Sequence, residues 1–447
     1  MTLSKILTLA ALTALLAVPS PALAAGPAAP RVLAEVNNYK LGKFEPVQGT
    51  YLGAYVLQDT LINGSMSEFN RLTGKKHASF FLYSGYGHQF PQQWFDDVEE
   101  AGAVPHLAWE PNRGLDEIKD NAYLRDFAKK LSSTGVPVFL RFASEMNGTW
   151  APYSGNPKEY IEKWRLVHDV MAEEAPNVIM VWTVFTFPTA TVTDYYPGDD
   201  YVDWVGVNIY NVIYHNNDIN SPAAHEDPLE LLDFVYNTFS RKKPIQISEF
   251  GVTHYTITDS KHYQSFAIDK LSRMYTGIRS KYPRVKSIFY FDVNNLINAP
   301  IDRRINNYAL TDNMDILSNY SNLIDDENFL SDISKNLEGE KDKELFNITD
   351  RVYLINGTTY VSTASLRDLL GASLMWQPGE RSIQLSHKDT EIVFPVRPLK
   401  NVGNQSAFII NGRSYLPLRT AAAALGYKLA WDADNNLIKV LLPERSN

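Results

Sequence analysis

Short apolar runs alternate with amphipathic stretches from about residue 50 to residue 292. This alternation predicts repeated strand–helix–strand units and therefore a parallel sheet. Eight of the runs are suited to strands: 51–56, 78–83, 104–109, 136–143, 178–185, 202–210, 245–250 and 285–292. Because eight parallel strands with their helices close into a barrel, we expect an α/β fold of the (β/α)8, or TIM barrel, class.

The chain of 447 residues is longer than such a barrel needs, so we expect further segments. Lys5, the apolar run 6–18 and the small residues around Ala24 predict a signal peptide over residues 1–25. A run this short favours a cleaved leader over a membrane anchor. The remaining boundaries that we predict are a barrel at 30–312, a polar linker at 313–347 and a small α+β domain at 348–447.

The last hundred residues contain an internal repeat. Ile355-Asn356-Gly357 recurs as Ile410-Asn411-Gly412 at a spacing of 55 residues, and Tyr, Gly, Trp and Ile residues recur at the same spacing. Asn-Gly predicts a hairpin turn, so each unit is expected to form a hairpin, a short helix and a strand. Trp376 and Trp431 are equivalent in the two units, and we expect both in the core.

Composition excludes several classes of partner. The net charge of −9 does not favour nucleic acid or an anionic membrane, which both require clustered Lys and Arg. The chain has no Cys, and its nine His residues show no paired metal-binding spacing. We therefore expect no disulfide, no cofactor and no catalytic metal. From the predicted signal peptide we expect a secreted protein, extracellular or associated with the cell wall, without a membrane span after leader cleavage. We expect it to be a monomer.

Two glutamates lie at the predicted carboxyl ends of strands. Glu145 follows the fourth strand, in Arg141-Phe142-Ala143-Ser144-Glu145, and Glu249 lies in the seventh, in Ile245-Gln246-Ile247-Ser248-Glu249. Strict strand alternation predicts that Arg141, Ala143 and Glu145 share one face, as do Ile245, Ile247 and Glu249. Both carboxylates would then reach the rim where barrel enzymes keep their active sites.

A pair of rim carboxylates is what retaining glycoside hydrolysis needs. One attacks the anomeric carbon, and the other protonates the leaving oxygen and then activates water, with a separation of about 5–5.5 Å. A single Glu at a strand end is more often a solvated or capping residue, so the hypothesis depends on the pair. Strand position alone leaves open which carboxylate has which role.

Three segments resemble glycoside hydrolase family 26, a family of β-mannanases with some β-glucanases and xylanases. The resemblance covers roughly residues 35–310 and is carried by residues 141–150, 196–206 and 244–251. It implies that Glu145 is the acid/base and Glu249 the nucleophile, and that Tyr210 hydrogen-bonds the nucleophile. The implied function is a retaining endo-β-glycanase that acts by double displacement on a β-mannan or a β-1,3/1,4-glucan.

One position departs from the family pattern. Many mannanases of the family have His before the acid/base, whereas this chain has Ser144. That His helps to shape the subsite for the cleaved sugar, so the mannanase reading is weakened. A hydrolase of the host's own exopolysaccharide therefore stays open as an alternative. A second, independent alternative is a non-catalytic carbohydrate-binding protein of the envelope, although such a protein has no need of both carboxylates.

Other residues are candidates for binding the polysaccharide. An inward-facing Arg141 needs a carboxylate partner, either Glu249 or Glu145, and would keep the nucleophile ionised or form a purely structural ion pair. Trp109 is either a sugar platform or part of the core, and His88 either touches substrate or is merely exposed. The whole predicted binding set is His88, Trp109, Glu110, Arg141, Asn147, Trp150, Tyr153 and Tyr210.

The C-terminal repeat resembles the copper amine oxidase N-terminal-like, or stalk, domain of secreted bacterial proteins. The match covers about residues 349–442 and is carried by the Ile-Asn-Gly turns, the short helices and the Trp-containing strands. Despite the name, one histidine, His387, and no Cys are too few ligands for copper. Contact with the cell wall and a spacer role are both possible functions of this domain.

Overall fold

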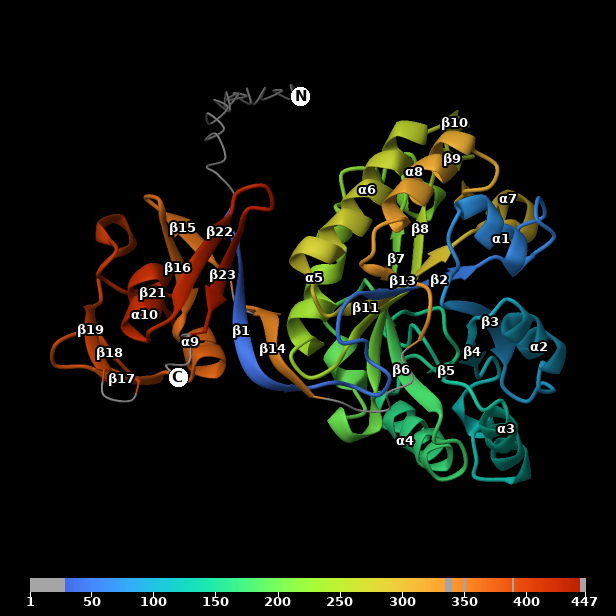
Figure 1. Ribbon diagram of the computed structural model, residues 1–447, viewed down its shortest axis with the longest axis horizontal. Coiled ribbons are helices and arrows are strands. Elements are labelled where there is room, and N and C mark those ends of the chain that lie inside the picture. Colours follow the sequence, from blue (N-terminus) through green and yellow to red (C-terminus); the bar gives the residue numbers. More distant parts are fainter. Residues whose placement is uncertain (1–28, 334–339, 349–350, 388–389, 443–447) are drawn as a thin grey trace, which may run out of the picture.

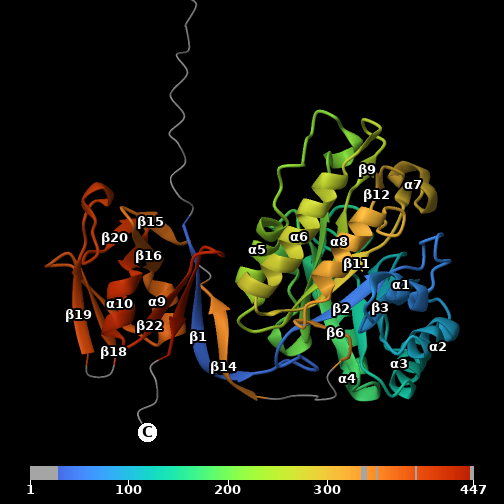
Figure 2. The same cartoon turned by 45° about the horizontal axis from the view of Figure 1, so that its top comes forward.

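The computed structural model of the chain describes residues 29–333, 340–348, 351–387 and 390–442. Figures 1 and 2 show a larger lobe of helices around a sheet and a smaller lobe of orange and red elements. The signal peptide expected at residues 1–25 lies outside the described residues. Among the helices of the described ranges, none combines the length and apolar character that crossing a bilayer requires.

The larger lobe is a closed parallel barrel, which confirms the predicted fold class. Its described strands follow one another around the sheet, and the last, β11, pairs with the first, β2, through Ser287↔Tyr51 to Phe291↔Tyr55. All eight predicted strands are present: β2 (Thr50–Tyr55), β3 (Ser79–Gly85), β4 (Val104–Glu110), β5 (Val138–Phe142), β6 (Val178–Phe185), β7 (Trp204–Asn211), β8 (Ile245–Val252) and β11 (Val285–Phe291).

Helices cover the outside of the barrel between most strands. The helix after β5 begins with a side-chain cap: the Asn156 side chain accepts a hydrogen bond from the Glu159 amide, and Pro157 opens the helix. The link from β6 to β7 contains two 3₁₀ turns, Val192–Tyr195 and Asp199–Tyr201, in place of a long helix. The helices are α1 (Met66–Thr73), α2 (Gln92–Glu100), α3 (Ala122–Ser133), α4 (Pro157–Glu174), α5 (Pro228–Phe239), α6 (Gln264–Lys281), α7 (Asn295–Asn298) and α8 (Met314–Ile324).

The barrel interior changes character along the strands. Near the amino ends, apolar side chains from β2, β5, β6 and β7 form a buried cluster that includes Tyr51, Phe139 and Trp204. Nearer the carboxyl ends, the buried polar residues Arg141, Asn208 and Glu249 lie inside, beside an aromatic cluster that includes Tyr55 and Phe291. The apolar layer closes the bottom of the barrel, so a ligand can approach the polar groups only from the carboxyl-end rim.

The boundaries of the two lobes differ from those that the sequence predicts. Within the expected linker 313–347, α8 packs on α6, and the short strand β13 (Phe329–Leu330) pairs with β2. Although α8 contains several Asn and Ser residues, one of its faces is buried and includes Ile316, Leu317 and Tyr320. The barrel lobe therefore extends at least to Leu330, and β14 (Glu340–Asn347) already belongs to the sheet of the second lobe.

The first described strand also belongs to the second lobe rather than to the barrel. β1 (Arg31–Lys40) lies between β14 and β23 (Leu437–Leu441), antiparallel to the former and parallel to the latter. In Figure 1, blue β1 accordingly stands beside orange and red strands. The small domain is therefore discontinuous in sequence, with the barrel inserted between β1 and β14.

The predicted repeat appears as two similar units. The first contains β15 (Tyr353–Ile355), β16 (Thr358–Ser362), α9 (Thr363–Leu370), β17 (Ser373–Gln377), β18 (Ser382–His387) and β19 (Thr390–Pro395). The second contains β20 (Phe408–Ile410), β21 (Arg413–Pro417), α10 (Leu418–Ala424), β22 (Lys428–Asp432) and β23. Asn356 and Gly357 have φ of 49° and 73°, and Asn411 and Gly412 have φ of 50° and 73°. Both residues of each turn have the positive φ that a type I′ hairpin requires.

The expectation that Trp376 and Trp431 are core residues is wrong, because their side chains are 47% and 56% exposed. Both lie on edge strands, β17 of the β17-β18-β19 sheet and β22 of the β14-β1-β23-β22 sheet. A side chain on an edge strand has a neighbouring strand on one side only, so a large ring there overhangs the sheet and meets solvent.

Candidate active site

Glu249 reaches the barrel interior through an irregularity in β8. Ile245 and Ile247 pack outward with helix residues in the main core, whereas Ser248 faces inward, 3.0 Å from the Thr183 hydroxyl. The pairing with β7 shifts between Val207↔Ile247 and Asn208↔Glu249, which marks a β-bulge. The predicted shared face of Ile245, Ile247 and Glu249 is therefore wrong: the bulge turns two consecutive side chains, Ser248 and Glu249, toward the interior.

Three donors hold the carboxylate of Glu249. Tyr83, near the end of β3, donates to Oε1 at 2.5 Å, and Arg141 on β5 donates to the same oxygen at 2.6 Å. Tyr210 on β7 donates to Oε2. Burial, reinforced by the charge of Glu249, raises the pKa of both tyrosines well above the usual value, so both phenols keep the protons that they donate.

Arg141 is fully buried and remains cationic. Burial alone lowers its pKa, but the neighbouring Glu249, Tyr83 and Glu110 raise it, and the result is a pKa above the usual value. The partner left open by the sequence is Glu249. A fully buried positive charge therefore lies 2.6 Å from Oε1 of Glu249.

Glu145 follows β5 in a tight turn with unusual backbone angles. β5 ends at Phe142, and Ala143 and Glu145 have φ of 46° and 59°. Non-glycine residues in this region cost about 1–3 kcal/mol each and persist only where the surroundings hold them. The strand alternation on which the prediction for Glu145 rested therefore does not extend this far, and the turn itself places the side chain at the rim.

The carboxyl group of Glu145 has two hydrogen-bond donors. Asn208 on β7 donates to Oε1 at 2.7 Å, and the indole of Trp150 donates to Oε2 at 2.8 Å. Burial and the charge of Glu249 raise the pKa of Glu145 to about 7, against the opposing effect of these donors. A carboxyl group with this pKa is protonated in a large fraction of molecules near neutral pH, as a general acid must be.

Asn208 and Arg141 connect the two carboxyl groups. The amide nitrogen of Asn208 contacts Glu145, while its amide oxygen accepts a 3.4 Å hydrogen bond from Arg141, which in turn contacts Glu249. The structure therefore brings Glu145 and Glu249 to one polar centre at the rim. One has a raised pKa and the other lies beside a buried cation, the asymmetry that separates an acid from a nucleophile.

Three predicted binding residues are enclosed by protein. Trp109 is fully buried and stacks on Phe127 with ring centroids 4.3 Å apart, so it is a core residue and no sugar platform. The Asn147 side chain forms hydrogen bonds with the backbone of Phe185 and Pro188, and it thereby holds the loop after β6. Tyr153 is 6% exposed, and its hydroxyl lies against Glu110.

The other predicted binding residues lie at the rim, beside the two carboxyl groups or in a surface loop. Trp150 is 48% exposed at the rim, and Tyr210 and Arg141 both contact Glu249. Glu110, the last residue of β4, accepts hydrogen bonds from Ser144, and burial raises its pKa despite these donors and Arg141. His88 is an exposed loop residue whose ring lies over Gly85, at the end of β3.

Two site residues are absent from the predicted set. Tyr83 contacts Glu249, and Asn208 contacts Glu145. Each has an inward-facing neighbour two positions away on its own strand, Phe81 for Tyr83 and Tyr210 for Asn208. The period-2 rule applied to the ends of the other barrel strands would therefore have found both.

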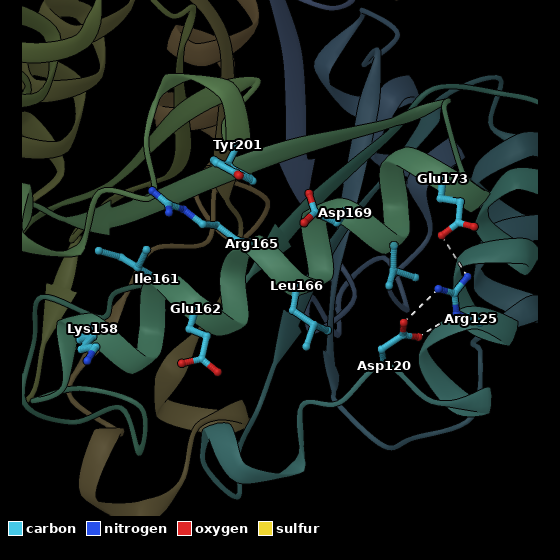
Figure 3. Close-up of a pocket in the computed structure, with 11 residues that line it drawn as sticks. Asp120, Arg125, Lys158, Ile161, Glu162, Arg165, Leu166, Asp169, Glu173 and Tyr201 are labelled. Carbon is cyan, nitrogen blue, oxygen red and sulfur yellow. Dashed lines mark hydrogen bonds and ion pairs between the residues drawn. The ribbon is translucent and has the colours of Figure 1, made fainter.

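A separate surface groove of about 760 Å³ lies on the outer side of the barrel, between α3 and α4. Figure 3 shows Arg125 there between Asp120 and Glu173, with contacts of 2.7 Å and 3.1 Å. The residues that line this groove include neither Glu145 nor Glu249. Across the residues that the structure describes, no three His, Asp or Glu side chains are grouped so as to hold a metal ion.

Two family models match the chain. The model described as glycosyl hydrolase family 26 matches residues 110–234, and the copper amine oxidase N-terminal domain matches residues 341–440. Both expected resemblances are confirmed. The first match runs from Glu110, the last residue of β4, into α5 and contains Glu145, so this part of the barrel is similar in sequence to glycosyl hydrolase family 26.

Curated relatives are similar over parts of the chain. Endoglucanase H of Acetivibrio thermocellus is 24% identical over 268 residues, which are 55% of this chain and 28% of that protein. The β-1,3-xylanase TXYA of a Vibrio species is 31% identical over 144 residues, 31% of this chain and 28% of that protein. A mannan endo-1,4-β-mannosidase of Caldalkalibacillus mannanilyticus is 27% identical over 172 residues, 36% of this chain and 29% of that protein. The chain thus spans less than a third of the length of these relatives.

Solved structures with a similar fold include an endo-β-1,4-mannanase double mutant of Cellulomonas fimi, at 16% identity and a TM-score of 0.46 over 64% of this chain and 73% of that one. Another is GH26C of a Muricauda species, at 15% identity and a TM-score of 0.48 over 63% of this chain and 87% of that one. Both identities are below 25% and both TM-scores below 0.5, so no conclusion about function follows from them.

Proposed function

We propose that the barrel, part of which matches glycosyl hydrolase family 26, makes this protein a secreted, retaining endo-β-glycanase. The observation that carries the proposal is the pair Glu145 and Glu249, which Asn208 and Arg141 connect. The pKa of Glu145 is raised to about 7, and Glu249 contacts the buried guanidinium of Arg141. A pure carbohydrate-binding protein has no need of two neighbouring carboxyl groups in such different electrostatic surroundings.

In the proposed reaction, the Glu249 carboxylate attacks the anomeric carbon while Glu145 gives its proton to the leaving glycosidic oxygen. The glycosidic bond breaks and a covalent glycosyl-enzyme ester forms. Glu145, now ionised, then takes a proton from water, whose oxygen attacks the anomeric carbon and releases Glu249. The three donors on Glu249 hold its carboxylate in place through both steps.

The proposed substrate is a β-linked polysaccharide of the mannan or β-1,3/1,4-glucan type. The curated relatives are named as an endoglucanase, a β-1,3-xylanase and a mannan endo-1,4-β-mannosidase, so they support a β-glycan without selecting one sugar. Ser144, where many mannanases have His, favours a glycan other than mannan, including the host's own exopolysaccharide as the second candidate. We also propose that the C-terminal domain contacts the cell wall.

The test is hydrolysis of β-mannan, mixed-linkage glucan, xylan and a bacterial exopolysaccharide, with product anomers followed by NMR. We expect turnover of one of them with retained configuration and a rapid loss of viscosity. Glu249→Ala and Glu145→Gln are expected to lower kcat at least about a thousandfold while the fold survives. Glu173→Ala, in the outer groove, is the matched control. Wild-type rates in both site variants would overturn the proposal.

A further inference from the structure

The turn that places Glu145 is held by hydrogen bonds to every backbone polar group of residues 143–145. The Ala143 amide donates to Trp109 and its carbonyl accepts from Tyr160. The Glu145 amide donates to Thr183 at 3.0 Å, and its carbonyl accepts from Gly148. These bonds explain how the two non-glycine residues on either side of Ser144, Ala143 and Glu145, keep a positive φ.

Ser144 is the middle residue of this turn, and two side chains hold it. Its amide donates to Oε2 of Glu110 at 3.0 Å, and its hydroxyl donates to Oε1 of the same carboxyl group. Its carbonyl lies 2.7 Å from the Tyr153 hydroxyl, which is also 2.6 Å from Oε2 of Glu110. All three polar groups of Ser144 are therefore bound by Glu110 and Tyr153, which we call the Ser144 clamp.

The clamp joins two parts of the chain that are separate in sequence. Glu110 ends β4, a rigid barrel strand, whereas Tyr153 lies in the loop that follows Glu145 and is 6% exposed. With its hydroxyl already engaged and its ring enclosed, Tyr153 is not available to stack a sugar. Glu110 likewise directs both carboxyl oxygens at Ser144. The contacts of both residues are thus with the turn that carries Glu145.

We propose that Glu110 and Tyr153 are positioning residues for acid catalysis, which fix the Glu145 carboxyl through Ser144. This inference rests on the proposed function, since it assigns Glu145 the role of proton donor. It replaces the sugar-binding roles expected for Glu110 and Tyr153. It also gives Ser144 a definite task, because its hydroxyl binds the strand-end carboxylate.

Loss of the clamp should impair proton donation by Glu145 in the first chemical step but leave nucleophilic attack by Glu249 unchanged. Glu249 is held independently by Tyr83, Arg141 and Tyr210, so nucleophilic attack does not depend on the clamp. Proton donation by Glu145 matters greatly for a poor leaving group and little for one that departs as a stable anion. Loss of the clamp is therefore expected to change the dependence of rate on the leaving group.

The experiment compares phenyl and 2,4-dinitrophenyl β-cellobioside and β-mannobioside as probes. For Glu110→Ala and Tyr153→Phe, kcat/KM on the phenyl glycoside should fall about 10- to 100-fold, whereas on the dinitrophenyl glycoside it should stay within about threefold of wild type. Ser144→Ala, which removes only the hydroxyl, should show the same pattern with a smaller loss. Glu173→Ala removes a carboxylate of the outer groove and should change neither rate.

The outcomes are distinct. Equal losses on both leaving groups in Tyr153→Phe and Ser144→Ala would show a general structural role and overturn the inference, while the proposed function stands. Wild-type rates on both leaving groups in these variants would overturn it as well. If Glu110→Ala does not fold, the leaving-group dependence of kcat/KM in Tyr153→Phe and Ser144→Ala decides whether the inference holds. If wild-type protein cleaves neither the aryl glycosides nor any polysaccharide, the proposed function fails and the inference fails with it.

Discussion

The indole nitrogen of Trp150 donates a 2.8 Å hydrogen bond to Oε2 of Glu145, although almost half of the Trp150 side chain is exposed. The ring lies directly over Gly148, where a Cβ atom would come within 2.4 Å of it. One side chain thus combines a bond to the proposed acid with an open aromatic surface at the rim. The position of the ring depends on the missing side chain at residue 148.

Trp150→Phe is expected to shift the pH profile of kcat/KM. The Trp150 N–H favours the ionised form of Glu145, so its removal should raise the pKa of Glu145 further above about 7. Because Glu145 must be protonated to act as an acid, the alkaline limb should move up by roughly half a unit to one unit. Trp431→Phe, an exposed ring in the other lobe, is the control. A downward shift in Trp150→Phe would contradict this assignment.

Gly148→Ala should reproduce part of that effect without replacing Trp150 itself. The added methyl group would occupy the space of the Trp150 ring and push it away from Glu145. We expect the alkaline limb to move in the same direction as in Trp150→Phe. In the double variant the second change should add little, because the hydrogen bond can be lost only once. Fully additive shifts would show that the two residues act separately.

Glu145→Gln should change how stability depends on pH. The folded-state pKa of about 7 lies above the ordinary Glu value of 4.5, so the protonated group favours folding below about pH 4.5, and this contribution is lost as pH rises through 7. The variant, which cannot ionise, should gain about 1–3 kcal/mol over wild type by pH 8, a range that allows for partial exposure. Chemical unfolding of both proteins at pH 4.5 and pH 8 checks this, and an unchanged difference between them would contradict it.

Arg31 connects the two lobes. It lies on β1, yet its guanidinium is 3.7 Å from the ring centroid of Tyr282 and 3.0 Å from Asp233 on α5. Arg31→Ala should lower stability by about 1–2 kcal/mol and increase hydrogen exchange in α5 and β1. Arg71→Ala, which removes an exposed helical ion pair with Glu68, is the control. Wild-type exchange in both elements would show that Arg31 does not hold the lobes together.

Deletion of residues 29–40 should destabilise the small domain and leave the barrel folded. Val32 and Ala34 are buried in the core of that domain, and removal of β1 would expose the edges of β14 and β23. A fragment of residues 340–442 should therefore melt at a lower temperature than the domain in the whole chain. A synthetic peptide of residues 29–40 should raise its Tm, whereas a scrambled peptide should not. A fragment that is equally stable without the peptide would contradict the pairing.

Much of the fold was predictable because it depends on local patterns. The eight barrel strands and the Asn156 cap follow from periodicity and from hydrogen bonding within a few residues. The type I′ turns at Asn356-Gly357 and Asn411-Gly412 follow from the ease with which these residues adopt positive φ. By contrast, the exposure of Trp376 and Trp431 depends on which strands lie at sheet edges, and no local pattern encodes this.

The amino-acid sequence by itself determined the barrel, the repeat and the two strand ends where Glu145 and Glu249 lie, because hydrophobic periodicity and turn chemistry act over short distances. Only the tertiary structure decided how the two side chains come together. The bulge at Ser248 turns Glu249 inward, and a left-handed turn held by Glu110 and Tyr153 places Glu145. The pairing of β1 with β23 across some four hundred residues likewise depends on contacts between distant segments. Such contacts form only when the whole chain has folded, so strand alternation cannot foresee them.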